Sequence, residues 1–407
     1  MNAMSGMPTV LFVAYGSGHI RMAVPVAQAL AAQGKARPLV LALTTAAPVA
    51  RAAGLAVLQF KDFLQATDGA ALNLGRQLMG ELEGPVADPD ETVAYLGLSM
   101  ADLIASEGEA QAWAAYRKFG RQALLPQRTL QGILRHVAPQ LVVATNSPRA
   151  ERAAILAART LGIPAVCLVD LFAIDEIQWV GAPGYADHVC VLNESVRQFL
   201  VAAGRPADQV SATGNPAFDA LNLPTARQQG SLLREQLGWQ FKRVLLWPMQ
   251  VEPAFHPYTA QAADPTLPAQ ALHALVQWVL AREDCVLCVR ARAGDELPVL
   301  PADPRIVVTG QELPLAPLLH ATDVVVTLNS TVGLEGHLAG CRLVQVLGSV
   351  FDAAMPLARH GIADAAVPLG GLPRALDSLH AAPRLDVQSQ APATGQVLTL
   401  LDRWLVS

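Results

Sequence analysis

The sequence predicts a two-domain α/β protein in which short buried strands alternate with helices. Its 407 residues are 52% hydrophobic and only 15% charged, enough to build two cored domains. Short apolar runs, such as 9–15 and 323–326, end in turn-forming or polar residues and precede helical patterns. Only the long segment 58–140 departs from this alternation, because its pattern is helical throughout. We therefore expect a helical insertion, about 60–137, in the first domain.

Composition excludes several classes of protein. The net charge is −5 and the basic residues are scattered, which disfavours nucleic-acid binding. No apolar run is long enough to span a bilayer, and the N-terminus lacks the pattern of a signal peptide, so we expect a cytoplasmic protein.

The five cysteines lie in apolar runs and are expected to be buried thiols. Cys285 and Cys288 have the spacing of a redox or zinc pair, but they share a predicted strand and no second pair exists.

The first strand, 9–15, leads through a glycine-containing turn, Gly16-Ser-Gly-His19, into a helical pattern over 20–32. Glycines at such a turn, Gly18 among them, let the backbone approach a ligand. The turn lacks the third glycine of the dinucleotide fingerprint, and Thr44 and Thr45 stand where an acidic residue would end the second strand. Nicotinamide binding is therefore disfavoured.

His19 begins the first helix and is a candidate general base. A helix N-terminus favours the neutral imidazole, which can accept a proton near pH 7. The alternative is that His19 caps the helix or packs structurally.

The insertion is expected to form the wall of a cleft where a second substrate binds. Trp113, Tyr116 and Phe119 could stack on a sugar, but their helical spacing favours a packed core. Nothing in this segment identifies the second substrate.

Further strands are predicted at 140–144, 163–169 and 188–192. Polar residues follow the first two, at the strand ends where ligand contacts collect in α/β proteins. These residues are Asn146, Ser147, Asp170, Asp175 and Glu176.

The second half is predicted to begin with a polar link, 224–230, and a strand, 244–247. Gln250 and His256 follow in a proline-rich loop, as ligand contacts or as parts of a rigid surface loop. Arg290 and Arg292 follow the strand 285–289, where they could bind a proposed pyrophosphate; the alternative is a solvated turn.

The segment 327–340 organises the second domain. It joins two predicted strands through a helix that the cap-type residues Asn329, Ser330 and Thr331 begin and Gly340 ends. A helix N-terminus at a strand's carboxyl end offers free N–H groups and a positive dipole to a phosphate or pyrophosphate. Glu335 lies one turn after Thr331 and could accept hydrogen bonds from sugar hydroxyls. The alternative is an ordinary capped βα unit with a solvated glutamate.

The stretch Ser330-Thr-Val-Gly-Leu-Glu335, followed by Ala339-Gly340, resembles the donor-site motif of nucleotide-sugar glycosyltransferases of the GT-B type. It is also similar to the UDP-N-acetylglucosamine 2-epimerases, which share that fold. The resemblance implies that the small polar residues bind a diphosphate and that Glu335 holds the ribose. It also implies two Rossmann-like domains facing a cleft: an acceptor-side domain 1–222, a nucleotide-sugar-binding domain 223–390, and a terminal helix within 391–407 packing back toward the first.

The turn ending at His19 resembles the first loop of inverting GT-B transferases, whose histidine deprotonates the acceptor hydroxyl. It is equally similar to nucleotide-sugar hydrolases, in which the histidine activates water. Met22 stands where many transferases have a proline, and Pro25 is displaced. Asp170 falls where the epimerases keep a catalytic glutamate, but Asn146 and Ser147 stand at their catalytic aspartate position, and neither can replace a carboxylate in acid–base chemistry.

Together these features predict an inverting, metal-independent glycosyltransferase that uses a nucleotide sugar, of UDP type, as a substrate and needs no cofactor. A hydrolase or epimerase of the same fold is the alternative, and a non-catalytic nucleotide-sugar-binding protein is a third. The acceptor, a saccharide, lipid or small molecule, is not identified, and peripheral membrane contact and a homodimer stay open. The predicted catalytic residues are His19 and Asp170, and the predicted nucleotide-sugar contacts are Gly18, Gln250, Arg290, Asn329, Ser330, Thr331, Gly333 and Glu335.

Overall fold

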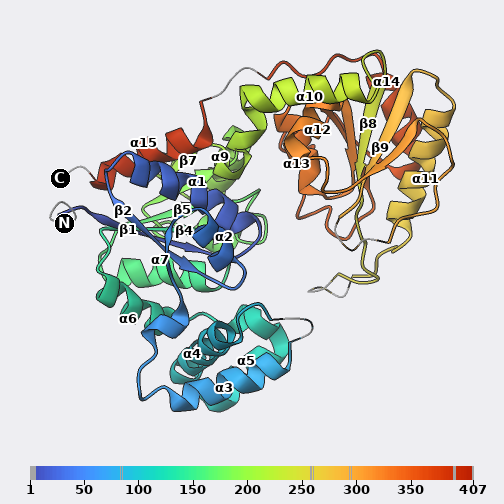
Figure 1. Ribbon diagram of the computed structural model, residues 1–407. Helices are drawn as coiled ribbons and strands as arrows, with labels where there is room; N and C mark the ends of the chain where they lie inside the picture. Colours follow the sequence, from blue (N-terminus) through green and yellow to red (C-terminus); the bar gives the residue numbers. More distant parts are fainter. Residues whose placement is uncertain are drawn as a thin grey trace. The chain divides into compact units, whose positions relative to one another are not determined.

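The computed structural model describes residues 6–82, 84, 86–256, 259, 261–292, 294, 296–387 and 391–405 (Figure 1). The chain forms two compact units. Unit 1 comprises Met1–Ala217 with Ala391–Ser407, and unit 2 comprises Phe218–Gln390. The sequence analysis placed the first boundary at 222, whereas the units separate after Ala217.

Unit 1 contains a seven-stranded parallel sheet with the order β3-β2-β1-β4-β5-β6-β7. The order runs outward from β1 in both directions, so β1 and β4 flank the point where the strand order reverses. Its strands are β1 Thr9–Ala14, β2 Arg37–Ala42, β3 Ala56–Leu58, β4 Leu141–Thr145, β5 Ala165–Leu168, β6 His188–Val191 and β7 Val210–Ala212.

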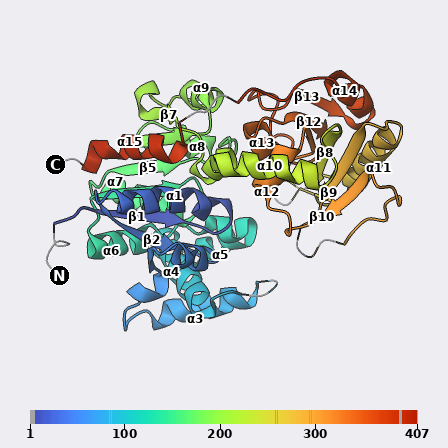
Figure 2. The same cartoon turned by 45° about the horizontal axis from the view of Figure 1, so that its top comes forward.

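Helices cover both faces of this sheet (Figure 1). Val10, Phe12 and Ala14 of β1 belong to a core shared with α1, α2 and the C-terminal helix α15, and Figures 1 and 2 show α15 beside α1. The alternate residues Leu11 and Val13 are buried on the other face, the side of α6 and α7. The helices are α1 Gly18–Ala32, α2 Ala46–Ala52, α6 Gln127–Val137, α7 Ala150–Thr160, α8 Ile177–Val180, α9 Glu194–Ala202 and α15 Ala393–Leu405.

The segment between β3 and β4 is helical, as predicted. After a 3₁₀ turn, η1 Phe60–Phe63, it forms α3 Gly69–Gly80, α4 Pro89–Glu107, α5 Glu109–Phe119 and a second 3₁₀ turn, η2 Gly120–Ala123. Glycines let α3 and α4 pack backbone to backbone: a Cβ on Gly75 would lie 2.0 Å from the carbonyl oxygen of Val93, and one on Gly97 would lie 2.1 Å from that of Ala71.

Unit 2 contains a six-stranded parallel sheet with the order β10-β9-β8-β11-β12-β13, which reverses between β8 and β11. It repeats the strand order of the first six strands of unit 1. Its strands are β8 Arg243–Pro248, β9 Cys285–Arg290, β10 Ile306–Thr309, β11 Val324–Thr327, β12 Arg342–Leu347 and β13 Ala365–Pro368. Its α-helices are α10 Pro224–Gln236, α11 Leu267–Leu280, α12 Leu315–Ala321, α13 Thr331–Leu338 and α14 Leu372–Leu379.

The predicted polar link 224–230 is wrong, because these residues form the first half of α10. The misleading residue is Pro224. It begins the helix at a position where proline is tolerated, since the first turn needs no backbone donor there. Ala226, Gly230 and Leu233 form the buried side of this otherwise polar helix.

Two other predictions can be compared with this structure. All five cysteines are free and buried, as predicted. Among the described residues, no helix combines the length and the apolar character that a membrane span requires.

The close approach of α3 and α4 predicts a large effect of a single methyl group. Gly75→Ala should destabilise unit 1 by about 1–3 kcal/mol, because the methyl group would meet backbone atoms that cannot rotate away. Gly80→Ala, in the same helix, is the matched control because no atom lies within 4 Å of its Cβ position. Urea unfolding of both variants measures the difference, and equal midpoints would contradict this packing.

Candidate functional site

The candidate site of unit 1 lies at the carboxyl edge of the sheet, where β1 turns into α1. Ser17, at the N-cap, has φ 62° and ψ −131°, a strained conformation for a residue with a Cβ. Gly16 is buried, and a Cβ there would lie 2.0 Å from Thr45 Oγ1, so packing requires this glycine. A Cβ on Gly18 would meet nothing within 4 Å. Packing therefore does not explain Gly18, and its predicted role in ligand approach stays a prediction.

His19 and Asp170, the two predicted catalytic residues, come together at this edge. His19 Nε2 lies 4.0 Å from Asp170 Oδ2, and the side chains are 21% and 29% exposed. That separation is too long for a direct hydrogen bond but lets both atoms contact one hydroxyl oxygen. The pair can therefore bind a hydroxyl group and accept its proton.

Hydrogen bonds hold the backbone around Asp170. Its N–H donates to Asn146 Oδ1 at 3.1 Å, its carbonyl oxygen accepts from Asn215 Nδ2 at 2.8 Å, and its Oδ1 accepts from the N–H of Leu171 at 2.8 Å. Asn146 is only 1% exposed. The Asn146 side chain thus positions Asp170 through its amide oxygen.

Glu176 places a second carboxyl group near Asp170. Burial, and then the charge of Asp170, raise the pKa of Glu176 to about 7. Glu176 is thus substantially protonated at neutral pH. Neighbouring carboxyl groups in different environments can divide acid and base roles between them.

The sequence analysis missed three site residues of this edge, Tyr15, Arg149 and Glu151. Glu151 is fully buried, and its Oε1 accepts from the N–H of Tyr15 at 2.6 Å. The guanidinium of Arg149 lies 4.5 Å from the centre of the Tyr15 ring. Burial opposes ionisation of Arg149, but Tyr95, Tyr15 and Glu151 outweigh it and raise the pKa of Arg149. The available signal was two charged residues at the start of the alanine-rich helix that follows β4.

In unit 2, Gln250 holds the turn between β11 and α13. Its Oε1 accepts from the hydroxyl of Thr327 at 2.9 Å and from the backbone N–H groups of Leu328, Asn329 and Ser330 at 3.0, 3.0 and 3.1 Å. The expectation that this turn leaves its N–H groups free is therefore wrong for these three residues. An amide oxygen occupies the position that an anion would otherwise take.

A second network fixes Asn329. Its Nδ2 donates to Ser349 Oγ at 2.7 Å, and Ser349 Oγ donates to Glu252 Oε2 at 2.8 Å. The other oxygen of Glu252 accepts from the N–H of Val350 at 2.8 Å, and Glu252 is 3% exposed. The loops after β8, β11 and β12 are thereby tied together at the carboxyl edge of this sheet.

The helix α13 begins as the sequence predicts. Ser330 is its N-cap, and Ser330 Oγ accepts from the N–H of Val332 at 3.3 Å. Thr331, in the first turn, is exposed, and Glu335 follows one turn later. Gly340, just past the helix, has φ 92°, a conformation that favours glycine.

Gly333 and Arg290, both predicted ligand contacts, have structural roles here. A Cβ on Gly333 would lie 2.7 Å from Thr327 Cγ2, so this glycine lets α13 pack closely on β11. Arg290 donates through Nη1 to the carbonyl oxygen of Leu313 at 2.7 Å. A ligand role for either residue stays a prediction.

Comparison with known proteins gives no family assignment from sequence: no family model matches, and no curated protein matches. Solved structures do match over nearly the whole chain. The UDP complex of S. aureus MnaA is 12% identical with a TM-score of 0.57, covering 98% of this chain and 97% of that one. A putative UDP-N-acetylglucosamine 2-epimerase from Listeria monocytogenes is 15% identical, with a TM-score of 0.57 and coverages of 99% and 98%.

CalG4, the calicheamicin glycosyltransferase, is 16% identical, with a TM-score of 0.55 and 98% of each chain covered. The chain has the GT-B fold. Since all identities are low, the likeness establishes this fold, and the activity has to be argued from the site. In this GT-B chain, the residues described above follow the carboxyl ends of the parallel strands of each unit.

One further cluster of this GT-B chain includes potential metal ligands. Asp284, Cys285 and His380 offer ligand atoms within 4.8 Å of one another. They lie at the start of β9, the amino edge of the sheet, whereas Gln250 and Ser330 follow strands at the carboxyl edge. The His380 Nε2 to Asp284 Oδ2 distance is 3.0 Å, so the two already pair with each other. The cluster is separate from the candidate site.

The raised pKa of Glu176 predicts a pH-dependent stability. The Glu176 carboxyl group keeps its proton up to about pH 7 in the folded state, whereas its ordinary pKa is 4.5. The stabilisation of the folded state by this bound proton is therefore present at low pH and is lost as the pH rises through 7. Glu176→Gln should therefore lose less stability than the wild type between pH 5 and pH 8, by on the order of 2 kcal/mol. Urea unfolding at both pH values measures this, and an unchanged difference would contradict the environment assigned to Glu176.

The role of Gln250 can be tested with two substitutions. Gln250→Leu removes the acceptor of four donors and should destabilise unit 2 by about 1–3 kcal/mol. Gln250→Glu keeps an accepting oxygen at that position but loses the 3.1 Å bond that Gln250 Nε2 donates to the Pro248 carbonyl oxygen, so it should destabilise unit 2 less than Gln250→Leu does. If both variants unfold alike, Oε1 does not hold the turn.

Proposed function

We propose that the protein is a glycosyltransferase that moves a sugar from a nucleotide-sugar donor to a hydroxyl group of an acceptor, with inversion and without a metal. The observation that carries this proposal is the convergence of His19 Nε2 and Asp170 Oδ2, 4.0 Å apart, at the carboxyl edge of unit 1. A base beside a carboxylate is the arrangement that removes a proton from a weakly acidic hydroxyl.

In this mechanism His19 Nε2 accepts the proton of the acceptor hydroxyl. The oxygen forms a bond to the anomeric carbon of the donor sugar as the bond from that carbon to the diphosphate oxygen breaks. The electron pair leaves with the nucleoside diphosphate. Asp170 stabilises the imidazolium that forms, and the backbone bonds from Asn146 and Asn215 keep the carboxylate in place.

The donor is assigned to unit 2. The N-terminus of α13 supplies a positive dipole, and Asn329, Ser330 and Thr331 supply polar side chains for a diphosphate. Glu335, one turn further along α13, is assigned to the ribose hydroxyls. Gln250 is assigned to shape the turn, and Gly333 and Arg290 to let the backbone or a charge approach the nucleotide. Gly18, in unit 1, is assigned to let the backbone approach the sugar that is transferred.

A UDP sugar is the proposed donor type, and it is a substrate, so no cofactor is required. Support comes from two solved structures of the same fold, MnaA with UDP and the Neisseria meningitidis UDP-GlcNAc 2-epimerase with UDP-GlcNAc, the latter 11% identical with a TM-score of 0.56.

Hydrolysis or epimerisation of the nucleotide sugar is the second candidate. It is favoured by Glu176, whose pKa of about 7 makes it a proton donor beside Asp170. Against epimerisation stands Asn146, an amide whose oxygen is already bonded to the Asp170 backbone.

Nucleotide release from UDP-, GDP- and CMP-sugars by the purified protein tests the proposal. A transferase releases nucleotide slowly alone and rapidly with an acceptor, whereas a hydrolase needs only water. His19→Ala should lower turnover about a hundredfold or more, and Asp170→Asn by a smaller factor. Both variants should bind UDP as the wild type does, because the nucleotide is assigned to unit 2.

Glu335→Gln is the matched variant for the other unit. It should weaken UDP binding, measured by calorimetry, while His19→Ala does not. Turnover that survives in His19→Ala would overturn the assignment of the base. Binding of UDP that is unaffected by Glu335→Gln would overturn the assignment of the ribose contact.

A further inference from the structure

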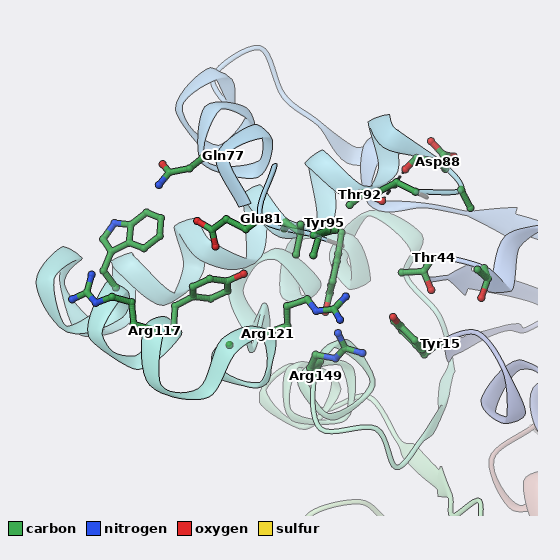
Figure 3. Close-up of a pocket in the computed structure, with 18 residues that line it drawn as sticks. Tyr15, Thr44, Gln77, Glu81, Asp88, Thr92, Tyr95, Arg117, Arg121 and Arg149 are labelled. Atoms are coloured by element: carbon green, nitrogen blue, oxygen red, sulfur yellow. Dashed lines mark hydrogen bonds between the residues drawn. The ribbon is translucent and has the colours of Figure 1, made fainter. Parts of the chain in front are cut away.

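Unit 1 contains a cavity of about 850 Å³, open to solvent on one side, between the helical insertion and the carboxyl edge of the sheet (Figure 3). Its walls come from the turns after β1 and β2, from α3, α4 and α5, and from the start of α7. The volume is that of a small-molecule site. Tyr15 lines the cavity and lies four residues before His19. The same turn, residues 15–19, therefore carries a residue of the cavity wall and the proposed base.

Positive charge gathers in this cavity. Arg117, Arg121 and Arg149 line it, and among the described residues none of the three forms an ion pair with a carboxylate. Figure 3 shows Arg121 and Arg149 close together, with Tyr15 beside them. Two neighbouring guanidinium groups repel each other unless an anion lies against them, and their donor geometry suits a carboxylate or a phosphate.

The Tyr15 phenol responds to this charge. Burial alone would raise its pKa, but the neighbouring Arg149 and, more weakly, Arg121 outweigh burial, so the pKa is lowered. The local potential therefore favours negative charge on a ligand.

Tyr95 provides an independent sign of a ligand. Its side chain is 4% exposed and lines the cavity, and its hydroxyl is buried without a hydrogen-bond partner among the described residues. An edge-to-face contact with Phe60, 5.2 Å between ring centres, fixes its ring. A buried hydroxyl without a partner costs free energy, which a polar group of a ligand would recover.

Aromatic and apolar side chains line other parts of the cavity. Trp113 and Tyr116 form an edge-to-face pair with ring centres 6.2 Å apart, and Leu82, Val86 and Leu96 also contribute. The sequence analysis favoured a packed core for the aromatic residues of α5. Tyr116 is buried, at 9% exposed, and also lines the cavity with Trp113, whereas Phe119 is 54% exposed. The lining therefore suits an organic body attached to the acid group.

The acidic residues of the lining do not neutralise the arginines. Asp88 pairs with Lys61 at 2.6 Å and caps α4 through the N–H of Glu91. Glu81 is exposed and forms no ion pair with an arginine in the part of the chain that the structure describes.

We infer that this cavity binds the acceptor, an organic acid whose carboxylate or phosphate pairs with Arg121 and Arg149. The acid group also meets the hydroxyl of Tyr95, and the body of the molecule lies against Trp113 and Tyr116. That the bound acid is an acceptor rests on the proposed function. That the cavity binds such an acid does not.

Calorimetric titration of the full chain tests this inference with four probes. Phenyl phosphate and benzoate carry an aromatic body with a phosphate or a carboxylate, phenol carries the body alone, and inorganic phosphate carries the acid alone. We expect at least one of the two aromatic acids to bind about tenfold or more tightly than phenol and inorganic phosphate, and the stronger of the two identifies the acid group.

Three variants locate the binding. Arg121→Gln and Arg149→Gln should each weaken the aromatic acid about tenfold or more, and Tyr95→Phe should weaken it by a smaller factor. Arg135→Gln, an exposed arginine of α6 outside the cavity, is the control and should leave binding unchanged. Arg121 is itself exposed, so its substitution tests the site without disturbing the core.

The inference is overturned if neither aromatic acid binds more tightly than phenol, or if Arg121→Gln and Arg149→Gln bind as the wild type does. UDP titration of the same samples separates this result from the proposed function. If the wild-type protein does not bind UDP, the proposed transferase is contradicted. If it binds UDP but no aromatic acid, only the assignment of the cavity is contradicted.

Discussion

The parallel order of the strands is the constraint on which the rest of the structure depends. In each unit the chain leaves the sheet in opposite directions from two adjacent strands, β1 and β4 or β8 and β11. The loops that follow these strands diverge and leave room for a ligand at the carboxyl edge. His19, Gln250 and Ser330 follow three of these strands, and Asp170 follows the next strand of unit 1, β5. The sheet order thus locates the candidate chemistry before any side chain is considered.

Electrostatics then distinguishes the carboxyl groups near His19. Asp170 is partly exposed and faces the imidazole, whereas Glu176 is more deeply placed and holds its proton to about pH 7. Fully buried Glu151 accepts from the backbone of Tyr15. Three acidic side chains at one sheet edge therefore have different tasks, and the sequence alone assigns the same negative charge to each of them.

Features set by neighbouring residues were predictable from the sequence, whereas contacts between residues far apart in the chain were not. The segment 327–340 contains its own cap residues and stop glycine, so its turn and helix follow from neighbouring residues. Gln250 illustrates the limit. Its place in the loop after a strand suggested a ligand contact, but its oxygen accepts hydrogen bonds from a turn almost eighty residues further along the chain. Arg121, Arg149 and Tyr95 likewise meet only through tertiary packing. Pro224 misled because proline both ends and begins helices, and only packing decides between the two.

The central claim is that the N-terminus of α13 binds a nucleoside diphosphate. Hydrogen–deuterium exchange of the protein with and without UDP tests it most directly. The account predicts that UDP slows amide exchange at the start of α13, in residues 331–335, and leaves the turn at 15–19 unchanged. Protection confined to unit 1, or no protection in the presence of saturating UDP, would contradict it.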